Sequence, residues 1–170
     1  MILIALGANL PSRFGGPADT LHHAIEVINT QSDIKVTKQS HIYKSAPVPI
    51  SDQPWYHNAV IAVETDLKPR ALLDVLHDIE EEFGRVRIER NEARVLDLDI
   101  IAFNDSVLDE DGFIIPHPRM SERAFVLFPI KDIAPEWSHP ITEVSVGDMI
   151  DALPEGQDIE RLEVENHDAA

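Results

Sequence analysis

Two aspartates stand two positions apart in an otherwise apolar stretch, ARVLDLDII at 93–101. On a β-strand, Asp97 and Asp99 would point to one face while Leu98 and Ile100 took the other. Two carboxylates buried side by side without partners would strongly destabilise the fold. The pair therefore needs cationic partners, and divalent metal ions are one class of them.

Arginines crowd around this stretch. Six of the nine arginines lie between 85 and 123, and four of them fall in 85–94, although the formal net charge of the chain is −17. Arginine forks match phosphate oxygens in pairs, and Mg²⁺ takes one or two carboxylates together with phosphates. The pattern suits a Mg²⁺–nucleotide site. The same pattern would also arise if the arginines only neutralised the two aspartates and the EEE run at 80–82. Pattern and charge alone leave both interpretations open.

Other catalytic patterns have less support. The chain has no G-x-x-x-x-G-K-[ST] for phosphates, no G-x-S-x-G for a serine nucleophile, and no cysteine. His117 lies between two prolines in IIPHP, where the rigid segment could aim an imidazole or form a plain turn. His22 and His23 are adjacent on an expected helix, and we expect them at the surface.

Composition restricts the partners. The 170 residues suffice for one domain, and an apolar share of 44% is that of a globular protein. The negative charge disfavours nucleic acid and anionic membranes, so an anionic substrate needs a local positive pocket. The absence of cysteine suits a cytoplasmic protein. The N-terminal stretch MILIALGANL lacks the features of a signal peptide, and no apolar run is long enough to approach a membrane span. We expect a cytoplasmic monomer.

The elements that must position these residues follow from periodicity. The sequence predicts strands at 1–7, 33–45, 56–65 and 95–103, and helices that open at Pro17 and Pro69. The order β-α-β-β-α-β is the split βαβ pattern of ferredoxin-like folds, which is an α+β sandwich with helices packed on one face of an antiparallel sheet.

A short apolar piece and a helix from 121 to 128 follow the last strand. We expect one domain over 1–153. The acidic tail at 154–170 shows no apolar stripe, so we expect it to be flexible and dispensable for catalysis.

Two long stretches carry a specific resemblance. GRVRIERNEARVLDLDII followed by IIPHPRMSERAFVLFPIKDIAPEW resembles the 6-hydroxymethyl-7,8-dihydropterin pyrophosphokinases of folate biosynthesis. IALGANL and DQPWYHNAVIAVET match the same family, in order and with its spacings, from about residue 2 to residue 150. The family's ferredoxin-like fold agrees with the order of elements above.

The resemblance implies the roles of the charged residues. Asp97 and Asp99 would bind two Mg²⁺ ions that bridge the phosphates of ATP, the co-substrate. Arg85 and Arg94 would be catalytic-loop arginines that contact the transferred group. Further nucleotide contacts are implied at Glu80, Arg87, the backbone of Ile100, His117 and Arg123.

The second substrate is then 6-hydroxymethyl-7,8-dihydropterin. The resemblance implies that Tyr56 and Phe125 sandwich its ring, since a flat ring fits between aromatic faces. Its polar edge would be bound by the Asn58 side chain and by the backbone at Ser45, Ala46 and Val48.

One loop departs from the family pattern. Before the second loop arginine the family often has an aromatic residue and Gly-Pro, whereas this chain has Asn91, Glu92 and Ala93. The departure concerns closure of the loop and not the metal site. Two rival functions are a ferredoxin-like regulatory module that holds a nucleotide, and a dihydroneopterin aldolase. The first would not need these residues together, and the second would leave the arginines and the D-x-D unexplained.

Overall fold

The computed structural model describes residues 1–46, 54–84 and 95–162. Its elements follow in this order: β1 (Ile2–Ala8), α1 (Pro17–Thr30), β2 (Ile34–Gln39), β3 (Tyr43–Ser45), β4 (Tyr56–Thr65), α2 (Pro69–Glu82), β5 (Asp97–Phe103), β6 (Leu108–Glu110), β7 (Phe113–Ile115), a 3₁₀ turn (Met120–Glu122), α3 (Ala124–Ile133), α4 (Val146–Asp151) and β8 (Ile159–Arg161).

Six strands form the main sheet. Its order is β5-β1-β4-β3-β8, with β2 also paired to β4, and every pair is antiparallel. β1 lies between β4 and β5 and is almost wholly buried, which explains its unbroken apolar sequence. The antiparallel sheet with packed helices confirms the predicted α+β fold.

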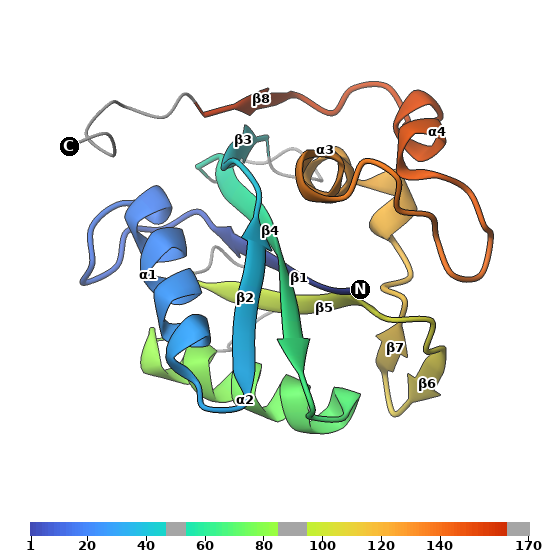
Figure 1. The fold of residues 1–170 in the computed structure, drawn as a ribbon. Coiled ribbons are helices and arrows are strands. Elements are labelled where there is room, and N and C mark those ends of the chain that lie inside the picture. Colours follow the sequence, from blue (N-terminus) through green and yellow to red (C-terminus); the bar gives the residue numbers. More distant parts are fainter. Residues whose placement is uncertain (47–53, 85–94, 163–170) are drawn as a thin grey trace.

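The sheet has helices on both faces (Figure 1). α1 and α2 cover one face, where Leu21, Leu76 and Leu98 belong to the larger apolar core. α3 and α4 cover the other face over a second core that includes Leu3 and Leu127. The sequence predicted the first layer, and the second layer adds to it.

Two elements differ in detail from the prediction. The strand expected at 33–45 is divided into β2 and β3, because the pairing of β2 with β4 shifts between Val36 and Lys38 and the chain is irregular before Tyr43. The helix expected at 121–128 begins at Ala124 and continues through Pro129 to Ile133. Pro129 lies inside α3 and has no N–H to donate to the carbonyl four residues earlier, yet the helix continues to Ile133.

The C-terminal segment also departs from the expectation of a loosely packed tail. Ile159–Arg161 form β8, which pairs with β3 and brings a segment remote in sequence to the edge of the sheet (Figure 1). This strand has no clear sequence pattern, because its residues are mostly exposed and it lacks an apolar face.

Candidate active site

A cavity of about 180 Å³ opens on the face of the sheet that α3 covers. β1, β3, β4, β5 and the start of α3 form its walls. Nine residues proposed from the sequence line it, namely Ser45, Ala46, Tyr56, Asn58, Asp97, Asp99, His117, Arg123 and Phe125. The fold thus gathers residues from four separate parts of the chain, and their roles stay predictions.

The two aspartates share the cavity face of β5, as the alternation of a strand requires. Asp97 lies opposite Gly7 on β1 and Asp99 lies opposite Ala5, and all four residues line the cavity. Leu98 between them is buried in the core beneath α1 and α2. Small β1 residues leave the space in front of the two carboxylates open.

Gly7 has a further role in this wall. A Cβ atom placed on it would come within 3.1 Å of Nδ2 of Asn58, its partner on β4. A larger residue would have to displace the amide, so the glycine allows a close approach at the strand end.

Glu80 holds β5 from behind the cavity. Its carboxylate, on the last turn of α2, is only 1% exposed and accepts the Leu98 N–H at 2.7 Å. β5 is an edge strand, so alternate backbone groups face away from β1. A buried charge-assisted bond at that edge fixes the backbone between Asp97 and Asp99. The described geometry makes Glu80 a support of β5; direct nucleotide contact stays a prediction.

His117 is anchored beside β5. Its backbone N–H donates to the Ile101 carbonyl at 2.9 Å, and its Nδ1 accepts the Arg119 N–H at 3.3 Å. Burial and the positive charges of Arg123 and Arg119 lower the pKa of His117 to about 4, against an opposing effect of Asp97. The ring is therefore neutral at physiological pH with its proton on Nε2, which makes that atom a hydrogen-bond donor.

Arg123 brings positive charge to the same cavity. Burial and Arg119 lower the pKa of its guanidinium, whereas Asp99 and Asp97 raise it. The guanidinium carbon lies 5.5 Å from the centre of the Phe125 ring, within the range of a cation–π contact. Arg123 can neutralise the aspartates and can equally meet an anionic ligand.

The polar pair Ser45 and Asn58 lies on the other side of the cavity. The Ser45 hydroxyl donates to Oδ1 of Asn58 at 2.8 Å, and both residues are almost fully buried. This bond orients the amide, so its remaining donors and acceptor are available in fixed directions. Tyr56 and Phe125 add aromatic surface to the cavity lining.

The carboxylate pair fits a divalent cation. No group of three or more His, Asp or Glu residues in the described parts of the chain could hold a metal ion. Protein ligands would therefore come from Asp97 and Asp99, and a metal there would complete its shell from phosphate and water oxygens, as Mg²⁺ commonly does.

For the other predicted residues, the structure gives less information about the proposed contacts. Ile100 has its side chain in the core under α1 and α2, which leaves its backbone as the only group for the proposed contact. Val48, Arg85, Arg87 and Arg94 lie outside the described residues, as does most of the loop at 46–55.

Sequence reasoning missed other residues around the cavity. Ala5, Ile101 and Val126 line it, and their small or apolar side chains carry no chemical signal. Asn9 is 1% exposed and donates to the Pro54 carbonyl at 3.1 Å, which ties the end of β1 to the segment before β4. The only sequence signal for Asn9 was its position, as an asparagine directly after an apolar strand.

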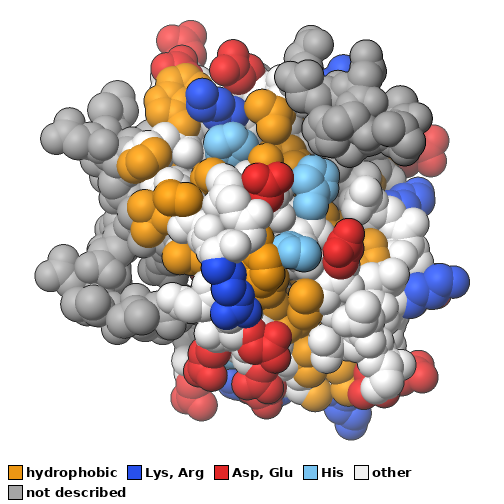
Figure 2. Space-filling model, turned by 90° about the vertical axis from the view of Figure 1, so that its left-hand side faces the viewer, with side chains coloured by type: hydrophobic (Ala, Val, Ile, Leu, Met, Phe, Trp, Pro, Cys, Tyr) orange, Lys and Arg blue, Asp and Glu red, His pale blue; other side chains and the backbone are white. Residues whose placement is uncertain are grey.

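The adjacent histidines lie away from the cavity. His22 and His23 are exposed on α1, as expected, and His23 contacts Phe14 with ring centroids 4.1 Å apart. Figure 2 shows histidines mixed with acidic and basic side chains on the face that includes α1, a composition typical of a solvated surface. In the part of the chain that the structure describes, no helix is both long enough and apolar enough to cross a membrane.

Comparisons with known proteins agree with this geometry. Residues 3–135 match the family model described as 7,8-dihydro-6-hydroxymethylpterin-pyrophosphokinase (HPPK). The 2-amino-4-hydroxy-6-hydroxymethyldihydropteridine pyrophosphokinase of Haemophilus influenzae is 40% identical over 141 residues, covering 83% of this chain and 86% of that one. Its Bacillus subtilis counterpart is 39% identical over 130 residues, covering 76% and 75%.

Longer proteins match as well. The folic acid synthesis protein fol1 of Pneumocystis carinii is 40% identical over 152 residues, and the chain spans 20% of its length. The Plasmodium falciparum HPPK-DHPS crystal structure superposes with a TM-score of 0.69 at 14% identity, over 89% of this chain and 40% of that one. That likeness supports the fold alone.

Proposed function

The chain belongs to the HPPK family, the pyrophosphokinases of folate biosynthesis, and we propose that it transfers the diphosphate of ATP to the hydroxymethyl group of 6-hydroxymethyl-7,8-dihydropterin. The products are AMP and the pterin diphosphate. One observation carries the proposal: Asp97 and Asp99 face a cavity that also holds Arg123, His117 and the bonded Ser45–Asn58 pair.

The pterin occupies the end of the cavity near β3 and β4. Its flat ring packs against Tyr56 and Phe125, which supply apolar faces. Asn58, oriented by Ser45, pairs with the polar edge of the ring, and the backbone at Ser45 and Ala46 adds to that edge. Buried polar groups of this kind reject rings that leave them unpaired.

The nucleotide phosphates occupy the end near β5. The guanidinium of Arg123 and Nε2–H of His117 donate to phosphate oxygens in a partly buried site, where such bonds are strong. A neutral His117 donates without needing a proton from solvent. Arg85, Arg87 and Arg94, outside the described residues, are proposed as further phosphate contacts.

The reaction is an in-line displacement at the β-phosphorus. The hydroxymethyl oxygen bonds to that atom and gives up its proton to solvent, the bond to the α–β bridging oxygen breaks, and AMP leaves with the electron pair. Asp97 and Asp99 would hold two Mg²⁺ ions, which would supply Lewis-acid stabilisation of the phosphate charge and would favour loss of the proton of the attacking hydroxyl. The residues of the chain orient both substrates and exclude water from the phosphates.

We propose the same monomeric, cytoplasmic setting that composition favours, without nucleic acid or membrane partners. The net charge of −17 supports the absence of nucleic-acid and anionic-membrane partners, and the positive side chain of Arg123 in the cavity accounts for an anionic substrate in an acidic protein.

Product analysis tests the proposal. The protein is incubated with ATP, Mg²⁺ and 6-hydroxymethyl-7,8-dihydropterin, and the nucleotides are separated over time. AMP should appear one-for-one with the pterin diphosphate, and omission of the pterin should abolish it. ADP as the main product, or equal AMP formation without pterin, would contradict the proposal; nucleotide binding without turnover would favour the regulatory module.

A further inference from the structure

A side chain from the C-terminal segment bridges the backbone on both sides of Arg123. Oε1 of Gln157 accepts the Ala124 N–H at 2.9 Å, and its Nε2 donates to the Glu122 carbonyl at 2.7 Å. One amide group thus bonds the residues that precede and follow Arg123, although it lies more than thirty positions away in sequence.

The two hydrogen bonds lie at the start of α3, which has no side-chain cap of its own. Ala124 is the first residue of α3, and Arg123 at the N-cap position makes no side-chain capping bond. The first N–H groups of a helix have no partner within the helix, so Gln157 satisfies one that would otherwise be unmet. Both Arg123 and Phe125, on either side of Ala124, line the cavity.

The same segment also holds the opposite wall. The Asp158 carbonyl accepts the Ala46 N–H at 3.0 Å, and Ile159 pairs with Ser45 across the β3–β8 ladder. Leu162 extends the attachment, since its N–H donates to the Ile42 carbonyl at 2.8 Å. We call residues 157–162 the strap, because they join β3 to the start of α3.

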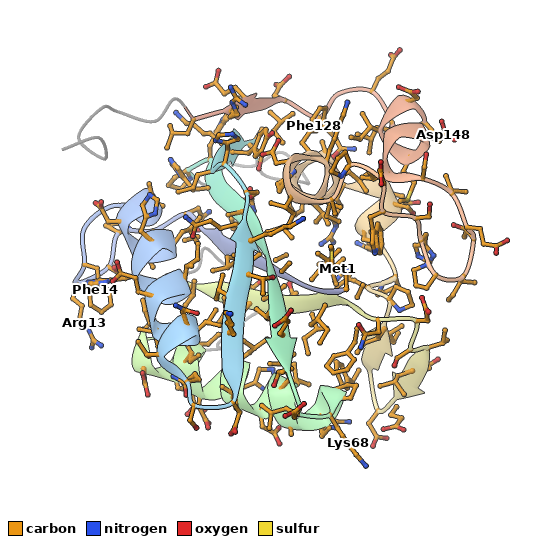
Figure 3. The ribbon with its side chains drawn as sticks, viewed as in Figure 1. Met1, Arg13, Phe14, Lys68, Phe128 and Asp148 are labelled. Carbon is orange, nitrogen blue, oxygen red and sulfur yellow. The ribbon has the colours of Figure 1, made fainter. Side chains whose placement is uncertain are left out.

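β3 and α3 also contact each other directly, at the other end of the helix from the strap. The Tyr43 hydroxyl, on β3, donates to Asp132 on α3 at 2.9 Å. Phe128 lies on the same helix (Figure 3), with its ring 6.2 Å from that of Tyr43. These contacts hold the later turns of α3 against β3. At the first turn, Val126 and Leu127 pack into the core beneath α3, and the strap adds the two side-chain hydrogen bonds on either side of Arg123.

We propose that Gln157 is a positioning residue for the pterin site. It sets the backbone of Arg123–Phe125 relative to Ser45 and Ala46, so that the aromatic face and the polar edge of the site form before the substrate arrives. The inference rests on the proposed function, because it concerns the geometry in which that substrate binds. Preorganisation of this kind acts on affinity by removing an ordering cost.

Three substitutions test it. Gln157→Ala removes both bonds and should raise the Kd for 6-hydroxymethyl-7,8-dihydropterin, and its KM, about tenfold, as expected for losing two neutral hydrogen bonds. Gln157→Glu keeps an acceptor for Ala124 but, when ionised, sets a carboxylate oxygen against the Glu122 carbonyl, so its increase should be no smaller than that of Gln157→Ala. Glu155→Ala is the matched control, an exposed residue two positions earlier, and should change neither constant.

The readouts separate positioning from stability. Kd is measured by calorimetry without nucleotide, KM and kcat by AMP release, and the unfolding midpoint by thermal denaturation, with all assays well below that midpoint. A higher KM with nearly unchanged kcat supports the inference. A lower midpoint with unchanged Kd and KM overturns it and leaves a structural role only. If the wild-type chain binds no pterin and makes no AMP, the proposed function itself has failed.

Discussion

At the scale of the residue, the two aspartates of β5 make the sharpest prediction. Asp97→Asn or Asp99→Asn keeps the shape of the side chain and removes one charge from the cavity face. We expect turnover to fall by at least about 100-fold, the size associated with loss of one preorganised electrostatic contact. Steady-state AMP release at saturating Mg²⁺ measures it.

The control for that change is Asp105→Asn. Asp105 lies in the exposed turn after β5 and outside the cavity lining, so its loss of charge should leave turnover unchanged. Folding should survive in both cavity variants, because removing one of two neighbouring carboxylates also removes their repulsion, and in Asp105→Asn because that side chain is exposed. Near-normal activity of either cavity variant would refute the metal assignment.

His117 makes a prediction about pH. Its pKa is lowered to about 4 in the folded protein, against 6.5 as its ordinary value. Between these values the unfolded chain binds the proton more readily, so this residue's contribution to stability is complete above pH 6.5 and is lost as pH falls toward 4. His117→Gln should therefore lose less stability than the wild type between pH 7 and pH 5, by about 2 kcal/mol.

Urea unfolding at several pH values gives that comparison. His139→Gln serves as the control, because burial lowers the pKa of His139 too but that residue lies outside the cavity lining. Like the His117 variant, His139→Gln should lose less stability than the wild type as the pH falls, but it should leave nucleotide binding unchanged. Parallel stability–pH curves for the His117 variant and the wild type would show that His117 is not held neutral.

Single residues were predictable where a strand imposed their direction. Asp97 and Asp99 share a face because side chains alternate along β5, and that could be seen in DLD alone. Glu80 could not be interpreted in the same way. Its bond to Leu98 depends on where the last turn of α2 meets β5, which local sequence does not specify.

At the scale of the element, that bond between α2 and β5 can be tested. Glu80→Ala leaves the buried Leu98 N–H without this acceptor, so the free energy of unfolding should fall by about 1–3 kcal/mol. Turnover should fall as well, because the backbone between Asp97 and Asp99 loses its support. Glu80→Gln keeps an acceptor and should be milder on both measures.

Urea denaturation and initial rates provide these measurements. Glu81→Ala, an exposed neighbour on α2, should be close to neutral in both. Full stability with lost activity in Glu80→Ala would instead indicate a direct contact with the nucleotide, as the resemblance implied.

Most elements could be predicted because their patterns are local. Pro17 and Pro69 open the first two helices, and the strands at 56–65 and near 97–103 follow from apolar runs. The bulge between Leu3 and Ile4 could not be predicted, since it depends on pairing between β1 and β5. It lets Ile101 and Ala102 both join the core beneath α3, against simple alternation.

At the scale of the whole molecule, the C-terminal segment changes the prediction for truncation. The sequence suggested that residues after Leu153 are dispensable, whereas in the structure β8 pairs with β3 and Gln157 bonds to the start of α3. A chain ending at Leu153 should therefore show a pterin KM raised by more than about tenfold, because the edge of β3 and the start of α3 both lose partners.

A chain ending at Leu162 is the comparison, since it keeps the whole strap. It should retain the affinity of the full chain for the pterin. Circular dichroism establishes that both shortened chains fold before KM is measured. Equal KM values for the two would mean that the strap adds nothing, and the original expectation of a dispensable tail would stand.

The two cores on opposite faces of the sheet have a consequence for how this sequence can change. Every cavity residue except Leu6 lies outside the core beneath α1 and α2, so that layer supports the sheet without meeting a substrate. Random libraries confined to the apolar inward positions of α1 and α2, with Glu80 kept, should yield many active members with altered heat tolerance. Libraries beneath α3 should yield few, since repacking there moves the cavity walls. Thermal adaptation of the enzyme can thus proceed through one layer while its substrate preference is inherited through the other.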